Sequence, residues 1–211
     1  QEKPQQRKSS GFVLPYGNSP LTYHKVAENV YLHLLNTSTN YVYIMTPYLI
    51  LDDELVRAMT FAARRGVDVR IIMPGIPDKQ YAFDIATTYF KALLDAGVRI
   101  FRYTPGFVHA KVYVSDGQQA VVGTINTDYR SLYQNFEDGV YLYKNLEVIK
   151  IEQDFEKTQA LSEEVTLESL SKMPIAHRTR WLSLFPDWTI DVKKEESYGY
   201  KNSFEIVRRP S

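Results

Sequence analysis

Apolar residues in the first half of the chain follow two periods, one typical of strands and one typical of helices. Short continuous runs rich in β-branched and aromatic residues predict buried strands, and apolar residues three and four apart predict helices. The expected order is strand 41–48, helix 52–65, strand 67–73, helix 80–96 and strand 98–103. Asp52 is a suitable N-cap for the first helix, and Gly66 and Gly97 stand where the two helices should end.

In the second half, strands follow one another without an intervening helix. Strands are expected at 108–115, 120–124 and 139–143, and a helix from about Leu146 to Leu161. Strand–helix–strand alternation favours parallel pairing, whereas consecutive strands favour antiparallel pairing. We therefore predict an α/β fold in which a mixed β-sheet is flanked by helices on both faces.

The chain divides into one domain and two flanking segments. Residues 1–10 are polar and rich in lysine and glutamine, which predicts a linker or a disordered lead. Residues 11–165 carry the alternating pattern and should form the domain. Residues 166–211 are expected to be a C-terminal helical segment and tail, with a helix over 167–181 and no element assigned to 187–211.

The composition excludes several classes of chemistry. The absence of cysteine excludes disulfides, thiol catalysis and cysteine–zinc sites. Lysine plus arginine equals aspartate plus glutamate, at 25 each, so the net charge gives no general attraction to nucleic acid or anionic lipid. No apolar run reaches the roughly 18 residues that span a bilayer. The chain begins with Gln1, so we expect a fragment or a processed product from which membrane segments could have been removed.

The segment 107–137 contains the residues best suited to chemistry. His109 and Lys111 lie two apart in an expected strand, so their side chains should project from the same face. Thr124 and Asn126 repeat this spacing downstream. Together these groups suit a phosphoryl group, because lysine supplies charge and the hydroxyl and amide supply neutral donors. Histidine can attack phosphorus or transfer a proton near neutral pH.

The turn between the two strands decides whether these side chains meet. Asp116-Gly117 is typical of a two-residue type I′ turn. That turn would pair Ser115 with Gln118, Lys111 with Val122 and His109 with Thr124. A four-residue loop would pair His109 with Asn126 and Lys111 with Thr124. Either even loop keeps the four polar groups on one face, whereas an odd loop would move one pair to the other face.

A structural explanation competes with the chemical one. A lone histidine or lysine on a strand is more often structural or solvated than catalytic. Two such pairs on opposed strands are harder to explain in that way, and Glu137 could hold the His109 imidazole by accepting its second N–H. The residues by themselves support a phosphate-handling site and a structural patch about equally.

The same segment resembles the HKD motif of the phospholipase D superfamily. The resemblance rests on His109-x-Lys111-x4-Asp116 and on Gly123-Thr124-x-Asn126-x-Asp128-x-Arg130-Ser131. Similarity to the bacterial cardiolipin synthase branch rests on Asn135-Phe136-Glu137, Thr46-Pro47-Tyr48 and the run 65–70. The match covers about 14–143 and the full string is highly specific, with mild departures at Leu49, Leu51 and Thr127.

The resemblance implies phosphatidyl transfer through a phosphohistidine, without a metal or another cofactor. For cardiolipin synthases, two phosphatidylglycerol molecules give cardiolipin and glycerol. Asp116 belongs to the candidate set but is expected to be a structural partner at the hairpin tip. The implied roles of the others are His109 as nucleophile or general acid, Lys111 and Asn126 on phosphate oxygens, Thr124 assisting them, and Glu137 orienting His109.

Superfamily enzymes need two HKD motifs, and this sequence contains one. We therefore expect the C-terminal catalytic half of a synthase, completed by a second half from the missing N-terminal region or from a symmetry mate. The full-length protein is expected at the bacterial cell membrane, and this fragment is expected to be soluble and on the cytoplasmic side. The alternatives are a homodimeric phosphodiesterase or nuclease, which the neutral charge disfavours, and a non-catalytic domain.

Overall fold

The computed structural model describes residues 10–172, 188–191 and 205–208. The expected polar lead and most of the expected C-terminal segment therefore lie outside the described residues. The first elements are β1 (Phe12–Asn18), α1 (Val26–Thr37), β2 (Tyr41–Met45), β3 (Leu49–Ile50), α2 (Asp53–Arg64), β4 (Asp68–Pro74), α3 (Gln80–Asp95) and β5 (Arg99–Tyr103). They are followed by β6 (Val112–Ser115), β7 (Gln119–Gly123), β8 (Thr127–Asp128), α4 (Tyr129–Tyr133), β9 (Glu137–Tyr143), α5 (Glu147–Ala160), β10 (Ser162–Val165), α6 (Leu167–Ser171), β11 (Trp188–Asp191) and β12 (Glu205–Arg208).

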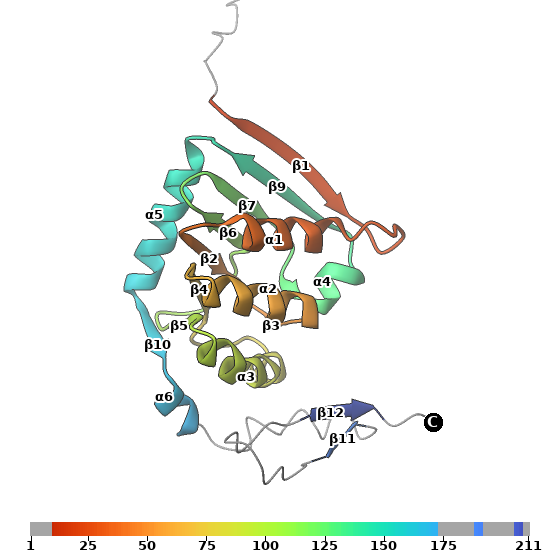
Figure 1. Cartoon of the computed structure of the whole chain (residues 1–211), viewed down its shortest axis with the longest axis vertical. Helices are drawn as coiled ribbons and strands as arrows, with labels where there is room; N and C mark the ends of the chain where they lie inside the picture. Colours follow the sequence, from red (N-terminus) through yellow and green to blue (C-terminus); the bar gives the residue numbers. More distant parts are fainter. Residues whose placement is uncertain (1–9, 173–187, 192–204, 209–211) are drawn as a thin grey trace, which may run out of the picture.

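Eight strands form one sheet in the order β1-β9-β7-β6-β2-β4-β5-β10 (Figure 1). The central strands β2, β4 and β5 are parallel, and the remaining pairs of this sheet are antiparallel. Two short ladders join β3 to β8 in parallel and β11 to β12 in antiparallel orientation. The predicted mixed sheet is therefore confirmed.

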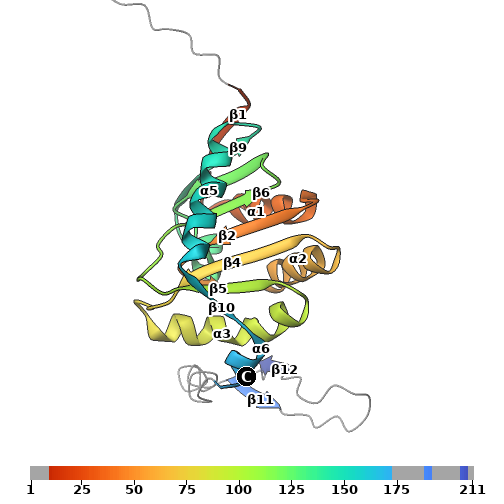
Figure 2. The ribbon, with the colours of Figure 1, turned by 90° about the vertical axis from the view of Figure 1, so that its left-hand side faces the viewer.

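Helices cover both faces of the sheet, as predicted. α1 and α2 lie on one side and α5 on the other (Figure 2). Successive residues of a strand point to opposite faces, and two neighbours in β4 show the consequence. Ile71 packs in the core that contains Leu55 of α2 and Phe90 of α3. Ile72 packs in the opposite core with Phe155 of α5.

Local signals set the helix ends where the sequence predicted them. Asp52 caps α2, because its carboxylate accepts a hydrogen bond of 2.8 Å from the Leu55 N–H. Gly66 and Gly97 follow α2 and α3 with φ angles of 94° and 96°. This left-handed backbone is accessible to glycine without strain, so each glycine ends its helix and turns the chain into the next strand.

The two edge strands, β1 and β10, were not predicted. β1 contains Pro15 and Gly17, which weaken a strand signal in the sequence. Proline is tolerated there because β1 pairs only with β9, leaving its other edge without a hydrogen-bonded neighbour in the sheet. These two segments are strands because they pair with β9 and β5, and this pairing is not visible in their own sequences.

The predicted turn in the β6–β7 hairpin is present, but both predicted registers are wrong. Asp116 and Gly117 have φ angles of 53° and 62°, and the Gln118 N–H donates to the Ser115 carbonyl at 3.0 Å. Gln118 is an additional residue that is left out of the β6–β7 ladder, and its carbonyl accepts a hydrogen bond from the Lys144 N–H after β9. Ser115 therefore pairs with Gln119, and the loop is odd.

Candidate active site

Three neighbouring strands bring the central candidate residues to one end of the sheet. Lys111 directly precedes β6, Thr124 directly follows β7, and Glu137 begins β9. The Gly123 N–H donates to the Lys111 carbonyl at 3.3 Å, and the Thr124 N–H donates to the Asp138 carbonyl at 2.9 Å. These backbone bonds place the three residues side by side. The cause is not the predicted alternation of side chains along a strand, because Thr124 lies beyond the end of β7.

The expected strand 108–115 begins only at Val112, so His109 and Lys111 lie in the segment before it. A two-residue strand period therefore does not align their side chains. The Lys111 ammonium folds back instead and donates to the His109 carbonyl at 2.6 Å. The bond joins the ammonium to the backbone of His109 and not to its imidazole.

Glu137 organises the hydroxyl and amide groups around it. One oxygen of its carboxylate accepts a hydrogen bond from the Thr124 hydroxyl, and the other accepts one of 3.0 Å from the Asn135 amide. The Thr124 hydroxyl in turn accepts from the Asp138 N–H at 3.0 Å. Thr124 and Glu137 are thus fixed relative to each other, and Asn135 joins the group although the sequence assigned it no role.

Lys111 is the buried cation of this group, with 9% of its surface exposed. Burial lowers the pKa of its ammonium below the ordinary lysine value, while the carboxylates of Glu137 and Asp128 act in the opposite direction. Both carboxylates therefore lie close enough to stabilise the charge. An ammonium held in this way can attract an anionic group that enters the site.

The His109 side chain is exposed, and its ring stacks on Phe107 with centroids 5.6 Å apart. Among the hydrogen bonds of the described residues, none joins this imidazole to Glu137. The predicted Glu137–His109 bond is thus not formed among the described residues, and the Glu137 carboxylate accepts from Thr124 and Asn135 instead. The imidazole remains accessible to a substrate.

Asn126 lies in the loop between β7 and β8, and its amide donates to the Ser131 hydroxyl at 2.9 Å. Asp128 caps α4 by accepting a hydrogen bond of 2.6 Å from the Ser131 N–H. The neighbouring Thr127 N–H donates to the Thr46 hydroxyl at 3.1 Å, which ties this loop to the end of β2. The loop that carries Asn126 is therefore fixed from several sides.

Asp116 lies at the hairpin tip, five residues from Lys111 and roughly 16 Å away along an extended strand. Its carboxylate accepts hydrogen bonds from the backbone of Thr39, Asn40 and Tyr41. Burial acts to raise its pKa, but these hydrogen bonds hold the pKa below the ordinary aspartate value. This placement favours the structural role over a place among the reacting groups.

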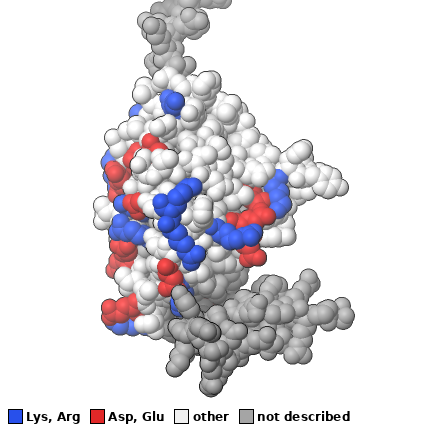
Figure 3. All heavy atoms as spheres, viewed as in Figure 1, with Lys and Arg blue, Asp and Glu red and all other residues white. Residues whose placement is uncertain are grey.

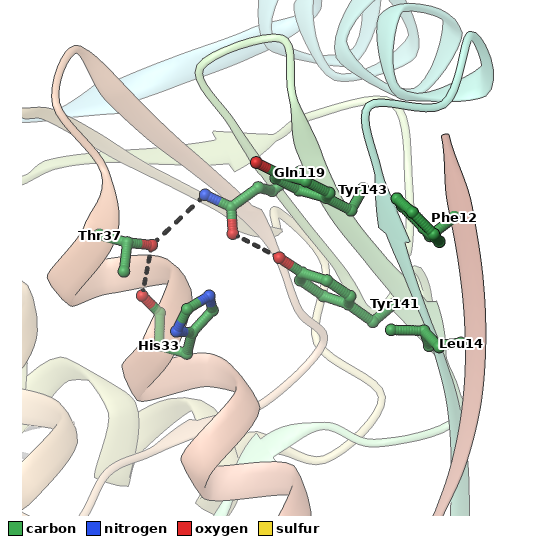
Figure 4. A pocket seen from close by; sticks show the side chains of 7 residues that line it. All are labelled: Phe12, Leu14, His33, Thr37, Gln119, Tyr141 and Tyr143. Atoms are coloured by element: carbon green, nitrogen blue, oxygen red, sulfur yellow. Dashed lines mark hydrogen bonds between the residues drawn. The ribbon is translucent and has the colours of Figure 1, made fainter. Parts of the chain in front are cut away.

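A separate hollow lies at the opposite end of the sheet, beside α1 (Figure 4). Its volume is about 420 Å³, and it is lined by Phe12, Leu14, His33, Thr37, Gln119, Tyr141 and Tyr143. The polar side chains bond to one another, because the Gln119 amide donates to Thr37 and accepts from the Tyr141 hydroxyl. This hollow contains none of the candidate catalytic residues.

Comparison with protein families and sequences identifies relatives of this domain. The family described as cardiolipin synthase, PLD-like domain, matches residues 31–159. An uncharacterised protein of Streptococcus mutans is 56% identical over 168 residues, covering 80% of this chain and 36% of that protein. A cardiolipin synthase of Clostridium perfringens is 40% identical over 151 residues, covering 72% of this chain and 32% of that protein. The chain thus spans about a third of the length of these relatives.

Solved structures support the same fold at low sequence identity. Nuc from Salmonella typhimurium, a phospholipase D family member, superposes with a TM-score of 0.61 and 17% identity, covering 73% of this chain and 97% of Nuc. Phosphatidylserine synthase from Haemophilus influenzae gives a TM-score of 0.59 and 18% identity, covering 82% of this chain and 45% of that structure. Family match and fold agree, and the chain belongs to the cardiolipin synthase PLD-like domain family of the phospholipase D superfamily.

Proposed function

We propose that this chain supplies one half of the active site of a phosphatidyltransferase that joins two phosphatidylglycerol molecules into cardiolipin and glycerol. The family match supports a phospholipid-modifying enzyme. The observation that carries the proposal is the convergence of Lys111, Thr124 and Glu137, together with the bond from the Lys111 ammonium to the backbone carbonyl of the exposed His109. A phosphodiester transfer requires a cation that holds phosphate oxygens and a histidine that attacks phosphorus or transfers a proton.

The reaction proceeds in two displacements at phosphorus. In one half of the site, a histidine nitrogen bonds to the phosphorus of the first lipid. The bond between phosphorus and the oxygen of the head-group glycerol breaks. The histidine of the other half gives glycerol its proton. That second histidine then removes a proton from the headgroup hydroxyl of the second lipid, whose oxygen attacks phosphorus and breaks the phosphorus–nitrogen bond. His109 fills one of these two positions.

The other side chains have supporting roles in this scheme. Lys111 and Asn126 hold phosphate oxygens, and the developing negative charge is stabilised by the Lys111 ammonium. Thr124 assists by holding Glu137 in place, because its single hydroxyl proton is donated to the Glu137 carboxylate. Glu137 acts through Thr124, whose hydroxyl it holds, rather than through a direct bond to His109.

Surface properties favour a lipid over a polynucleotide. Positive and negative side chains are interspersed on the face shown in Figure 3, and the region over β1 and β9 carries little charge. Nucleic-acid sites usually present a clustered basic surface, whereas the chain as a whole is neutral. Phe107 and Phe136, which are 39% and 71% exposed, stand next to the polar residues and offer apolar contact to an amphiphile.

A single substitution tests the proposal in the complete enzyme, in which this chain is joined to its second half. His109→Ala should lower the rate of cardiolipin formation from phosphatidylglycerol vesicles to less than about one hundredth of the wild-type rate, because it removes a nucleophile or proton donor. His33→Ala is the matched control, since His33 is exposed in the distant hollow and should leave the rate unchanged. A variant at His109 that keeps more than this residual rate contradicts the proposal.

A further inference from the structure

The Asn126 amide depends on one partner for its orientation. Its nitrogen donates to the Ser131 hydroxyl, whereas its oxygen is buried and has no hydrogen-bond partner among the residues that the structure describes. The Ser131 hydroxyl therefore fixes where the amide group lies, with the amide nitrogen toward the serine oxygen. Of the described residues, Ser131 is the hydrogen-bonding group that fixes the rotation of this side chain.

Ser131 is itself held from three sides. Its side chain and backbone are 1% exposed, its N–H donates to the Asp128 carboxylate, and its carbonyl accepts from the Asn18 amide at 3.2 Å. The Asn18 amide also donates to the Leu132 carbonyl at 2.9 Å. The short helix α4 is thus anchored to the end of β1, and the Ser131 hydroxyl has little freedom to move.

We propose that Ser131 is a positioning residue for phosphate binding, which acts by holding the Asn126 amide. The Ser131 oxygen accepts one N–H of the amide nitrogen, and the second N–H is left to donate to a phosphate oxygen. This inference rests on the proposed function, because it takes Asn126 as a phosphate-binding group. Ser131 does not contact the substrate.

A double-mutant cycle in the complete enzyme tests this coupling. Ser131→Ala should lower kcat/KM for phosphatidylglycerol about tenfold, the size expected for losing one hydrogen bond. In the Asn126→Ala background, the same substitution should change kcat/KM by less than about twofold, because Ser131 then has no amide to hold. A merely structural role would give similar losses in both backgrounds, and that outcome overturns the inference.

Two further measurements separate the ways in which the test can fail. If Ser131→Ala does not fold, as judged by circular dichroism, Ser131→Cys keeps the volume with a weak acceptor and should show the same non-additive loss. If Asn126→Ala keeps the wild-type kcat/KM, the phosphate-binding role of Asn126 and the Ser131 inference are both wrong. If Asn126→Ala is impaired and Ser131→Ala adds its full effect, the proposed function stands and the role of Ser131 falls.

Discussion

At Lys111, the proposed function and the stability of the fold have opposite requirements. Its ammonium is largely enclosed by protein, and burial lowers its pKa despite the nearby carboxylates of Glu137 and Asp128. A buried cation destabilises a fold unless it is fully compensated. The proposed reaction requires this charge, because phosphate oxygens must be held where water is partly excluded.

Replacing Lys111 should therefore separate activity from stability. Lys111→Met should abolish lipid transfer in the complete enzyme, while its melting temperature at pH 7 should equal or exceed that of the wild type. Because the folded-state pKa is lowered, the unfolded wild-type chain binds more protons between that pKa and about 10.4, so wild-type stability rises with pH in this window. The difference in melting temperature between Lys111→Met and the wild type should therefore become smaller as the pH approaches 10. Thermal unfolding at pH 7 and pH 10 checks this, and a variant that melts several degrees lower at pH 7 contradicts it.

The identities of most candidate side chains could be taken from the sequence, but their contacts could not. His109, Lys111, Thr124 and Glu137 stand in a specific string. The sequence offers no means of deciding that Glu137 bonds to Thr124 and Asn135 rather than to His109, because this depends on the distance between side chains after folding. Ser131 was part of the string, yet only its hydrogen bond to Asn126 gives it a role.

At the scale of the element, the turn of the β6–β7 hairpin could be predicted from local sequence, but the register of its two strands could not. The turn at Asp116-Gly117 follows from residues that tolerate positive φ, and the structure has it. The register depends on Gln118, whose carbonyl bonds to Lys144 from beyond β9. A residue distant in sequence thus bonds to the extra residue of the loop, and no pattern within the hairpin predicts that contact.

The approach of β7 to β9 at the site depends on Gly123. A Cβ atom there would lie 2.2 Å from the Asp138 carbonyl oxygen and 2.8 Å from the Gly139 Cα, and neither backbone atom can move aside without shifting its strand. Gly123→Ala should force the strands apart next to the Thr124–Glu137 bond. We expect a loss of about 1–3 kcal/mol in the free energy of unfolding, as for other overpacked sites, together with a large loss of transfer activity.

Urea unfolding and the vesicle assay measure the two effects of Gly123→Ala. Gly106→Ala is the matched control, because a Cβ at Gly106 would meet no atom within 4 Å and its φ is not positive. That variant should keep its stability to within about 0.5 kcal/mol, the usual range for surface substitutions. Equal behaviour of the two alanine variants would show that close strand approach at Gly123 is unimportant.

For the whole molecule, the share of each related protein that this chain covers is the informative comparison. It covers about a third of its sequence relatives, nearly all of Nuc and less than half of phosphatidylserine synthase. The same unit is therefore found as a complete chain and as part of a longer one. No helix among the described residues is long and apolar enough to cross a membrane. The sequence predicted the sheet and its helical layers, but a single HKD-like string could not show how the proposed second half would be supplied.

Mixing intact and inactive chains distinguishes the two ways of completing the site. If both halves lie in one chain, co-expressing equal amounts of wild-type and His109→Ala enzyme should leave about half of the wild-type specific activity, because each molecule carries its own site. If a twofold axis joins two copies so that each site needs both His109 residues, only about one quarter of randomly assembled dimers are intact. With a larger share of the variant, activity should follow the wild-type fraction in the first case and its square in the second. We expect the linear relation, and specific activity plotted against the measured chain ratio decides it; a quadratic relation would show instead that a second copy of the chain completes each site.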